Sequence, residues 1–146
     1  MAIDISDDVI VVVGAEEHIL KSRDFSRLCG SLKRFRRVGS DRKQQYLKSF
    51  MRRYMRYLRD YLSVVRILRS VDDVNELIRK ISPAVIVVDD KIYGILNHPV
   101  KIRESSPKPK YMDYLLLIAD NLANYFRKLL KENLSAYVNE LREIEK

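Results

Sequence analysis

The chain has 146 residues, of which 47% are hydrophobic and 33% charged, and its formal net charge is +8. This length and apolar content suffice for a folded core, which excludes a disordered chain, so we expect a single domain over residues 1–146. The lone cysteine, Cys29, excludes an intrachain disulfide and a zinc site built from cysteines.

The composition also indicates where the protein works. Its first eight residues are acidic, whereas a signal peptide begins with basic residues. The longest apolar runs, residues 9–13 and 115–119, are far shorter than the ~18 residues of a membrane-spanning helix. We therefore predict an intracellular, cytoplasmic protein without a membrane partner. Its many charged residues, the absence of Trp and the few glycines are typical of a thermophile.

The first predicted elements are a strand and a helix. The β-branched run 9–13, which acidic residues precede and Gly14 follows, predicts a strand buried on both faces. Ser22 is a good N-cap residue, and apolar residues follow it at helical spacings as far as Phe35. We predict that this second element is a helix that Gly39 ends.

The longest predicted element is a basic helix from about Asp41 to Arg69. Apolar residues repeat through it at alternating steps of three and four, which is an a/d pattern. Neighbouring apolar residues widen this stripe, so we predict that the helix packs within a bundle. Ser70 then begins a further helix with the spacing of a capping box, and Pro83 ends that helix.

Two more strands and a C-terminal helix complete the prediction. The apolar runs 84–88 and 92–96 flank Asp89-Asp90-Lys91, which has turn chemistry, so we predict a hairpin there. Residues 97–110 contain three prolines and predict an irregular connector, after which a long helix begins at Tyr111. The expected fold class is α+β, mainly a helical bundle with a small sheet of about three strands.

Positive charge is concentrated between Lys33 and Arg69, where the sequence has 13 Lys and Arg residues but only two acidic residues. Arginines at seven-residue spacing mark a strip roughly 20 Å long on the predicted helix, opposite the apolar stripe. Arginine suits a phosphate backbone, because its planar donors match phosphate oxygens and each contact releases counterions. The residues that we predict to contact nucleic acid are Lys48, Arg52, Arg56, Arg59, Arg66, Arg34 and Arg37.

We therefore predict a non-catalytic protein that binds DNA or RNA through backbone phosphates, as an accessory subunit of a nucleoprotein complex. A basic helical domain interrupted by a small β element resembles the small subunits of archaeal CRISPR interference complexes. That resemblance implies a place in such an assembly and assigns no residue roles. The alternative is a helical protein–protein interaction module, or a homodimer, in which the arginines pair with acids of a partner or of the same fold.

A third hypothesis is a small metal-dependent nuclease. Asp89 and Lys91 match half of a PD-(D/E)xK site, in which carboxylates hold a divalent metal, and Asp72 or Asp73 would supply the upstream carboxylate. The simpler interpretation of this half-motif is a hairpin turn. Asp120 is interpreted as part of the polar edge of the C-terminal helix. The two histidines have no metal-ligand spacing to each other or to the cysteine, so we expect no enzyme activity and no metal or other cofactor.

Overall fold

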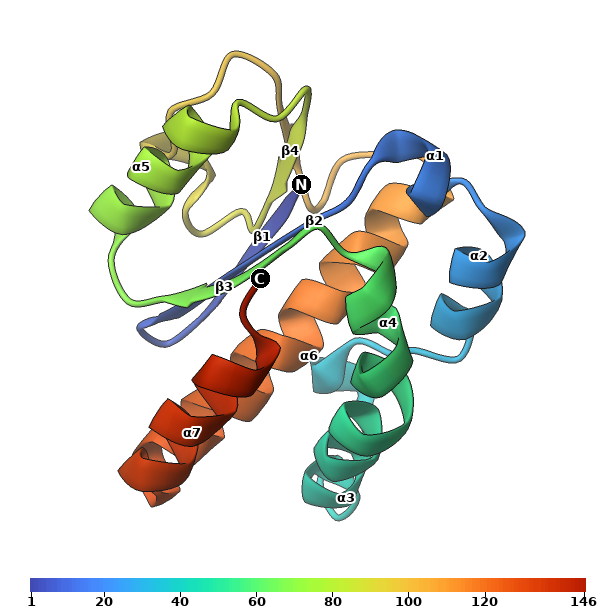
Figure 1. Ribbon diagram of the computed structural model, residues 1–146, viewed down its shortest axis with the longest axis vertical. Coiled ribbons are helices and arrows are strands. Elements are labelled where there is room, and N and C mark those ends of the chain that lie inside the picture. The colour runs from blue at the N-terminus through green and yellow to red at the C-terminus, as the bar shows by residue number, and fades with distance from the viewer.

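The computed structural model describes residues 1–146 and shows an α+β fold in which helices cover both faces of a five-stranded mixed sheet (Figure 1). The strand order is β3-β2-β1-β4-β5. Strand β2 pairs in antiparallel orientation with both β3 and β1, whereas β1, β4 and β5 are parallel to one another. The strands are β1 (Ala2–Ser6), β2 (Val9–Gly14), β3 (Val64–Leu68), β4 (Ile86–Val88) and β5 (Lys101–Arg103).

Helical segments make up most of the remaining chain. Two of them, η1 and η3, are short 3-10 helices, and η2 is a π-helix that joins α3 to α4 without a break. The helices are α1 (Glu17–Leu20), α2 (Arg23–Cys29), η1 (Phe35–Arg37), α3 (Lys43–Ser49), η2 (Phe50–Met55), α4 (Arg56–Tyr61), α5 (Val71–Ile81), η3 (Tyr93–Ile95), α6 (Lys110–Glu132) and α7 (Leu134–Ile144). None of them combines the length and the apolar character that crossing a membrane requires.

The two faces of the sheet bury different side chains, because successive residues of a strand point to opposite sides. On one face, Ile3 of β1 packs in a cluster with Val74 of α5. On the other face, Val11 of β2 belongs to a larger cluster with Leu58 of α4 and Leu122 of α6. In Figure 1, α5 and α6 accordingly lie on opposite sides of the strands. A polar residue within a strand is therefore directed toward one helix or the other by its register.

Several predictions from the sequence are confirmed. The α+β class holds, and the run 9–13 forms the fully buried strand β2. The Ser70 hydroxyl accepts a hydrogen bond from the backbone N–H of Asp73 and caps α5, as the capping-box spacing predicts. The C-terminal helix begins one residue before Tyr111. Asn133 then interrupts it and caps α7 by accepting a hydrogen bond from a backbone N–H.

The strand β1 was missed, and with it the true size of the sheet. Its residues Ala2, Ile3 and Asp4 are all buried, and β1 forms a hairpin with β2. Asp7 and Asp8 form the connection, in which Asp7 adopts a positive φ of 53° that Asp tolerates better than most residues. Three acids within eight residues made this segment look like a polar terminus, although two belong to the turn and one faces inward.

The predicted basic helix 41–69 is wrong beyond Tyr61. The backbone is extended at Leu62, and residues 64–68 form β3, paired with β2 along their whole length. These residues are mostly β-branched, which favours a strand. Their pairing with the buried strand β2 outweighs the helical spacing of their apolar residues. Within the helix, the buried residues step by five from Phe50 to Met55, because the π-helix inserts an extra residue.

The predicted hairpin at 84–96 is also wrong, as is the continuous helix to Gly39. After β4 the chain turns into η3, and the parallel partner of β4 is β5, which lies inside the predicted connector. The first helix, α2, ends at Cys29 and is followed by a loop and η1. The apolar stripe that suggested a dimer packs partly within the fold itself, where Leu58 is fully inaccessible, whereas Tyr57 is 54% exposed.

Cys29 provides a direct test of this packing. Its side chain is completely buried, and desolvation raises the pKa of the thiol to about 12. We expect alkylation by iodoacetamide at neutral pH to be slow in the folded protein, because the thiolate fraction is roughly 1,000-fold smaller than for an ordinary thiol. Mass spectrometry should show rapid modification only after unfolding. Rapid labelling of the native protein would contradict the placement of α2 in the core.

Candidate functional site

The structure separates the predicted nucleic-acid-binding residues into three places. One group lies on the continuous helix formed by α3, η2 and α4, a second lies where that helix and β3 meet the C-terminus, and a third lies at the two ends of η1. In that order, the groups are Lys48, Arg52 and Arg56; Arg59 and Arg66; and Arg34 and Arg37.

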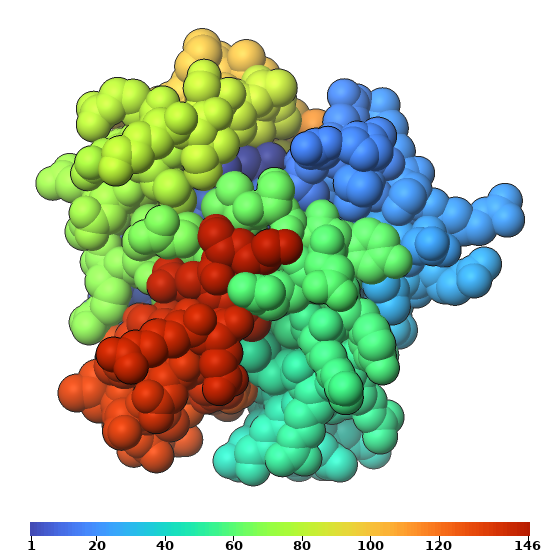
Figure 2. Space-filling model, viewed as in Figure 1, coloured from blue at the N-terminus to red at the C-terminus, as the bar shows by residue number.

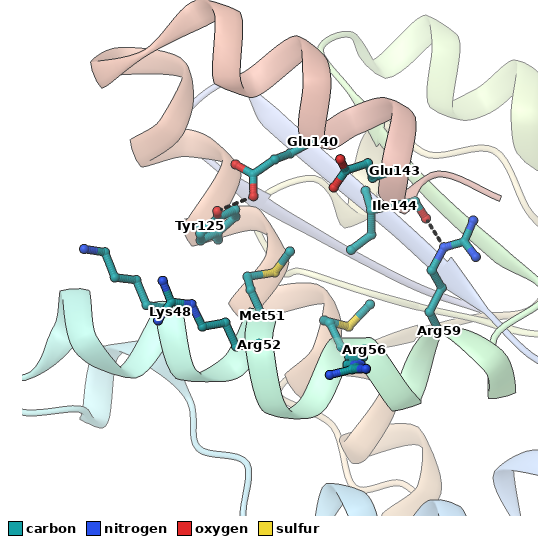
Figure 3. Close-up of a pocket in the computed structure, with 10 residues that line it drawn as sticks. Lys48, Met51, Arg52, Arg56, Arg59, Tyr125, Glu140, Glu143 and Ile144 are labelled. Atoms are coloured by element: carbon teal, nitrogen blue, oxygen red, sulfur yellow. Dashed lines mark hydrogen bonds between the residues drawn. The ribbon is translucent and has the colours of Figure 1, made fainter.

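Lys48, Arg52 and Arg56 form what we call the basic patch. All three side chains are exposed and none forms an ion pair. They line one wall of a groove of about 420 Å³. Figure 3 shows that the other wall comes from α7, where Glu140 and Glu143 face the groove. The basic patch therefore keeps its charges free but lies opposite two carboxylates.

Arg59 and Arg66 are engaged within the chain. The Arg59 guanidinium donates hydrogen bonds to the carbonyls of Ile144, at 3.1 Å, and Glu145, at 3.2 Å (Figure 3). A cation at this position is favourable because the C-terminus of α7 carries partial negative charge. Arg66 is on β3, not on a helix, and forms an ion pair of 3.2 Å with Glu145. Both arginines help to hold the C-terminal residues in place. Figure 2 shows these C-terminal residues lying over the segment that contains α4 and β3. The predicted strip of outward-facing arginines is therefore wrong at these two positions.

A second polar cluster lies where the parallel strands β4 and β5 end, beside the middle of β1. The backbone N–H of Asp89 donates to the carbonyl of Ile3, and that of Glu104 donates to the carbonyl of Val88, each at 2.9 Å. This register places Asp4 of β1, Asp89 after β4 and Glu104 after β5 side by side in one line across the sheet. We call these three residues the carboxylate row.

The carboxylate row faces α6. Ile3 and Val88 pack on the α5 side, so the next residue of each strand, Asp4 or Asp89, points to the opposite side. On α6, Asp120 faces the row, and burial, opposed by the hydrogen bond from the backbone N–H of Phe35, raises the pKa of its carboxyl group. Four carboxyl groups from four segments of the chain therefore meet between the sheet and this helix.

Asp4 is the most unusual member of the row. It is only 5% exposed, no N–H group donates a hydrogen bond to its carboxyl group, and this group lies next to the carboxyl group of Asp89. Asp89 is itself only 4% exposed. Burial and then the negative charges of Asp120 and Asp89 raise the pKa of Asp4 well above its usual value. The raised pKa favours the protonated form of the Asp4 carboxyl group, and a bound cation would favour its ionised form.

The other two carboxyl groups have partners. Glu104 accepts a hydrogen bond from Nη1 of Arg34 at 2.9 Å, and Asp120 accepts one from the backbone N–H of Phe35 at 2.8 Å. No group of three or more His, Cys, Asp or Glu side chains is arranged to hold a metal ion. Asp89 also has a partner, since it accepts a hydrogen bond from the backbone N–H of Lys91 at 2.9 Å, so Asp4 is the one carboxyl group of the cluster to which no N–H group donates.

The carboxylate row differs from the nuclease site that the sequence suggested. Asp89 belongs to both, but Asp72 and Asp73 are exposed at the start of α5, which covers the other face of the sheet. Lys91 reaches Asp89 through its backbone N–H, at 2.9 Å, and not through its ammonium group. The carboxylate that joins Asp89 is Asp4, from the strand that the sequence did not reveal.

A weak signal of the row is present in the sequence. Each of the three acids stands two residues after an apolar residue on the α6 side of its strand, as Ala2 precedes Asp4 and Ile102 precedes Glu104. Such a spacing is common and gains meaning only when the strands are known to be neighbours. Comparisons with protein-family models, with curated proteins and with solved structures found no match.

Proposed function

We propose that this protein is a divalent-cation-dependent phosphodiesterase that acts on nucleic acid at the carboxylate row. The observation that carries the proposal is that the buried carboxyl groups of Asp4 and Asp89 lie side by side, where β4 ends beside the middle of its parallel neighbour β1. Ligands of open sheets bind at this edge, and strongly perturbed carboxyl groups cluster at functional sites. The proposal departs from the non-catalytic role expected from the sequence, because the sequence did not reveal that Asp4 lies beside Asp89.

The pair fits Mg²⁺ better than a fully protein-bound metal. Mg²⁺ prefers oxygen ligands, keeps several of its waters, and is commonly held by one or two carboxylates together with a substrate phosphate. Asp4 and Asp89 would supply two carboxylates once the Asp4 carboxyl group has lost its proton.

The proposed reaction is hydrolysis of a phosphodiester. An oxygen of water forms a bond to phosphorus while the bond from phosphorus to one sugar oxygen breaks. The attacking water releases a proton to the solvent, and the leaving sugar oxygen takes one up, so a phosphate monoester and a free hydroxyl result without any redox change. Bound Mg²⁺ would supply charge stabilisation on the phosphate oxygens. Asp4 and Asp89 would hold and orient it, and their burial would limit the access of bulk water.

The charge around the row favours a polyanionic substrate. Arg34 lies beside Glu104, and the charge of Arg36 acts on Asp120 from the same loop. The chain as a whole carries a net charge of +8. A positive rim attracts a polyphosphate backbone to a carboxylate site that would otherwise repel it. Nucleic acid is therefore the substrate class that combines a phosphodiester with the required charge.

A cleavage assay tests this function. Labelled single- and double-stranded DNA and RNA are incubated with the protein in Mg²⁺, in Mn²⁺ or in EDTA. We expect shortened products with either cation and none in EDTA, and calorimetry should detect Mn²⁺ binding to the protein alone. Intact substrates in every cation, together with no Mn²⁺ binding, would exclude the proposal.

The second candidate is the non-catalytic nucleic-acid binding that the sequence suggested, as an accessory subunit of a nucleoprotein complex. The free charges of Lys48, Arg52 and Arg56 favour it. Phosphate contacts of this kind weaken steeply as salt rises, because each one depends on counterion release. Binding that needs no divalent cation and disappears at moderate salt, without any cleavage, would identify this function.

A further inference from the structure

We infer that Arg34 binds the phosphate group of the substrate at the carboxylate row and that Glu104 positions Arg34 for this role. The inference rests on the proposed phosphodiesterase function and assigns a substrate-binding residue to that site. It follows from three features of Arg34, namely its surrounding charge, its unused hydrogen-bond donors and the anchoring of its backbone.

The first feature is electrostatic. Four carboxyl groups converge at the site, and one divalent cation neutralises only two charges, so an approaching phosphodiester anion would still meet net negative charge. Arg34 is placed to reduce it, because its guanidinium pairs with Glu104 and interacts with the charges of Asp120 and Asp4. Although burial favours the neutral form, these carboxylates raise the pKa of Arg34, which therefore stays charged.

The second feature is the set of free donors on Arg34. A guanidinium carries several N–H groups in a planar fork, and only Nη1 of Arg34 is used, in the 2.9 Å hydrogen bond to Glu104. The side chain is 25% exposed, so the unused donors reach solvent at the edge of the row. A guanidinium that is fixed by a carboxylate through one N–H group and keeps other N–H groups unpaired can bind a phosphate through the unpaired groups.

The third feature is the rigid backbone on both sides of Arg34. The carbonyl of Lys33 accepts hydrogen bonds from Asn121, at 3.1 Å, and from the Tyr46 hydroxyl, at 3.0 Å. On the other side, the backbone N–H of Phe35 donates to Asp120. Two of these anchors belong to α6, which also faces the carboxylate row. Arg34 is therefore held in place before any substrate arrives, as an effective electrostatic contact requires.

The test compares Arg34→Ala and Arg34→Lys with the wild-type protein on a labelled oligonucleotide in Mg²⁺. We expect kcat/KM to fall by about 100-fold for Arg34→Ala and less for Arg34→Lys, because lysine keeps the charge but lacks the fork. Mn²⁺ affinity measured by calorimetry should stay the same or increase, since a neighbouring positive charge is removed. Millimolar guanidinium should partly restore cleavage by Arg34→Ala. The matched control is Arg69→Ala, which removes an exposed arginine that also pairs with a single carboxylate, Asp8.

Other outcomes are equally informative. Unchanged kcat/KM in Arg34→Ala would make the ion pair with Glu104 purely structural, and increased cleavage would make Arg34 a block to cation entry; either result overturns the inference while the function stands. An oligonucleotide-binding measurement by fluorescence anisotropy in Ca²⁺ separates the two proposals. If the wild type binds but does not cleave, Arg34→Ala must still weaken binding. If the wild type neither binds nor cleaves, both proposals fail.

Discussion

Replacement of Asp4 by asparagine is expected to abolish cation-dependent cleavage and, at the same time, to stabilise the fold. The carboxyl group of Asp4 is buried against Asp89, with no N–H donor, and its negative charge would be repelled by Asp120. An asparagine has the same shape without the charge, so we expect the free energy of unfolding to rise by about 1 kcal/mol. Losing a cation ligand should reduce cleavage by at least ~100-fold, since a bound metal contributes several kcal/mol to catalysis.

The two effects are measured on the same protein samples. Denaturant unfolding without divalent cations reports stability, calorimetry reports Mn²⁺ binding, and the cleavage assay reports activity. Asp89→Asn should behave similarly, whereas Asp60→Asn, which changes an exposed carboxylate on α4, should alter none of the three quantities. A variant at Asp4 that is strongly destabilised, or that cleaves as well as the wild type, would show that the pair is structural.

Removal of the free charges from the basic patch is expected to weaken nucleic-acid binding without unfolding the protein. Arg52 and Arg56 are exposed and unpaired, so Arg52→Gln with Arg56→Gln should lower affinity for an oligonucleotide about 10- to 30-fold at low salt. Because each lost phosphate contact removes about 0.9 from the slope of log affinity against log salt concentration, that slope should become shallower by about 2. Glutamine is preferred to glutamate here, since Glu140 and Glu143 line the opposite wall of the groove.

Arg59 provides the contrasting variant for this experiment. Its guanidinium donates to the last carbonyls of α7, so Arg59→Gln should lower the unfolding free energy by about 1 kcal/mol, because a cation at a helix C-terminus is removed. A salt titration monitored by fluorescence anisotropy and a thermal melt distinguish the two kinds of arginine. Unchanged affinity and salt slope in the double variant would exclude the basic patch as a binding surface and leave the carboxylate row as the remaining candidate.

The candidate site was only partly predictable. The sequence drew attention to Asp89 only through a half-motif that was interpreted as a hairpin turn, and the partners considered for it, Asp72 and Asp73, lie at the start of α5, on the other face of the sheet. Asp120 was taken for the polar edge of a helix, since nothing local distinguishes a carboxylate that faces solvent from one that faces a sheet. The basic segment was correctly located, yet charge alone could not separate free arginines from those paired within the fold.

Local residue patterns determined the α+β class, the strand β2, the capped helix α5 and the concentration of charge between Lys33 and Arg69. These features depend on side chains a few residues apart, so the sequence contains them directly. Tertiary structure decided that residues 64–68 form a strand, that β5 pairs in parallel with β4, and that Asp4, Asp89 and Glu104 stand in one line. Such decisions depend on strand pairing between distant segments, whose register turns three unremarkable acids into neighbours on the same face of the sheet.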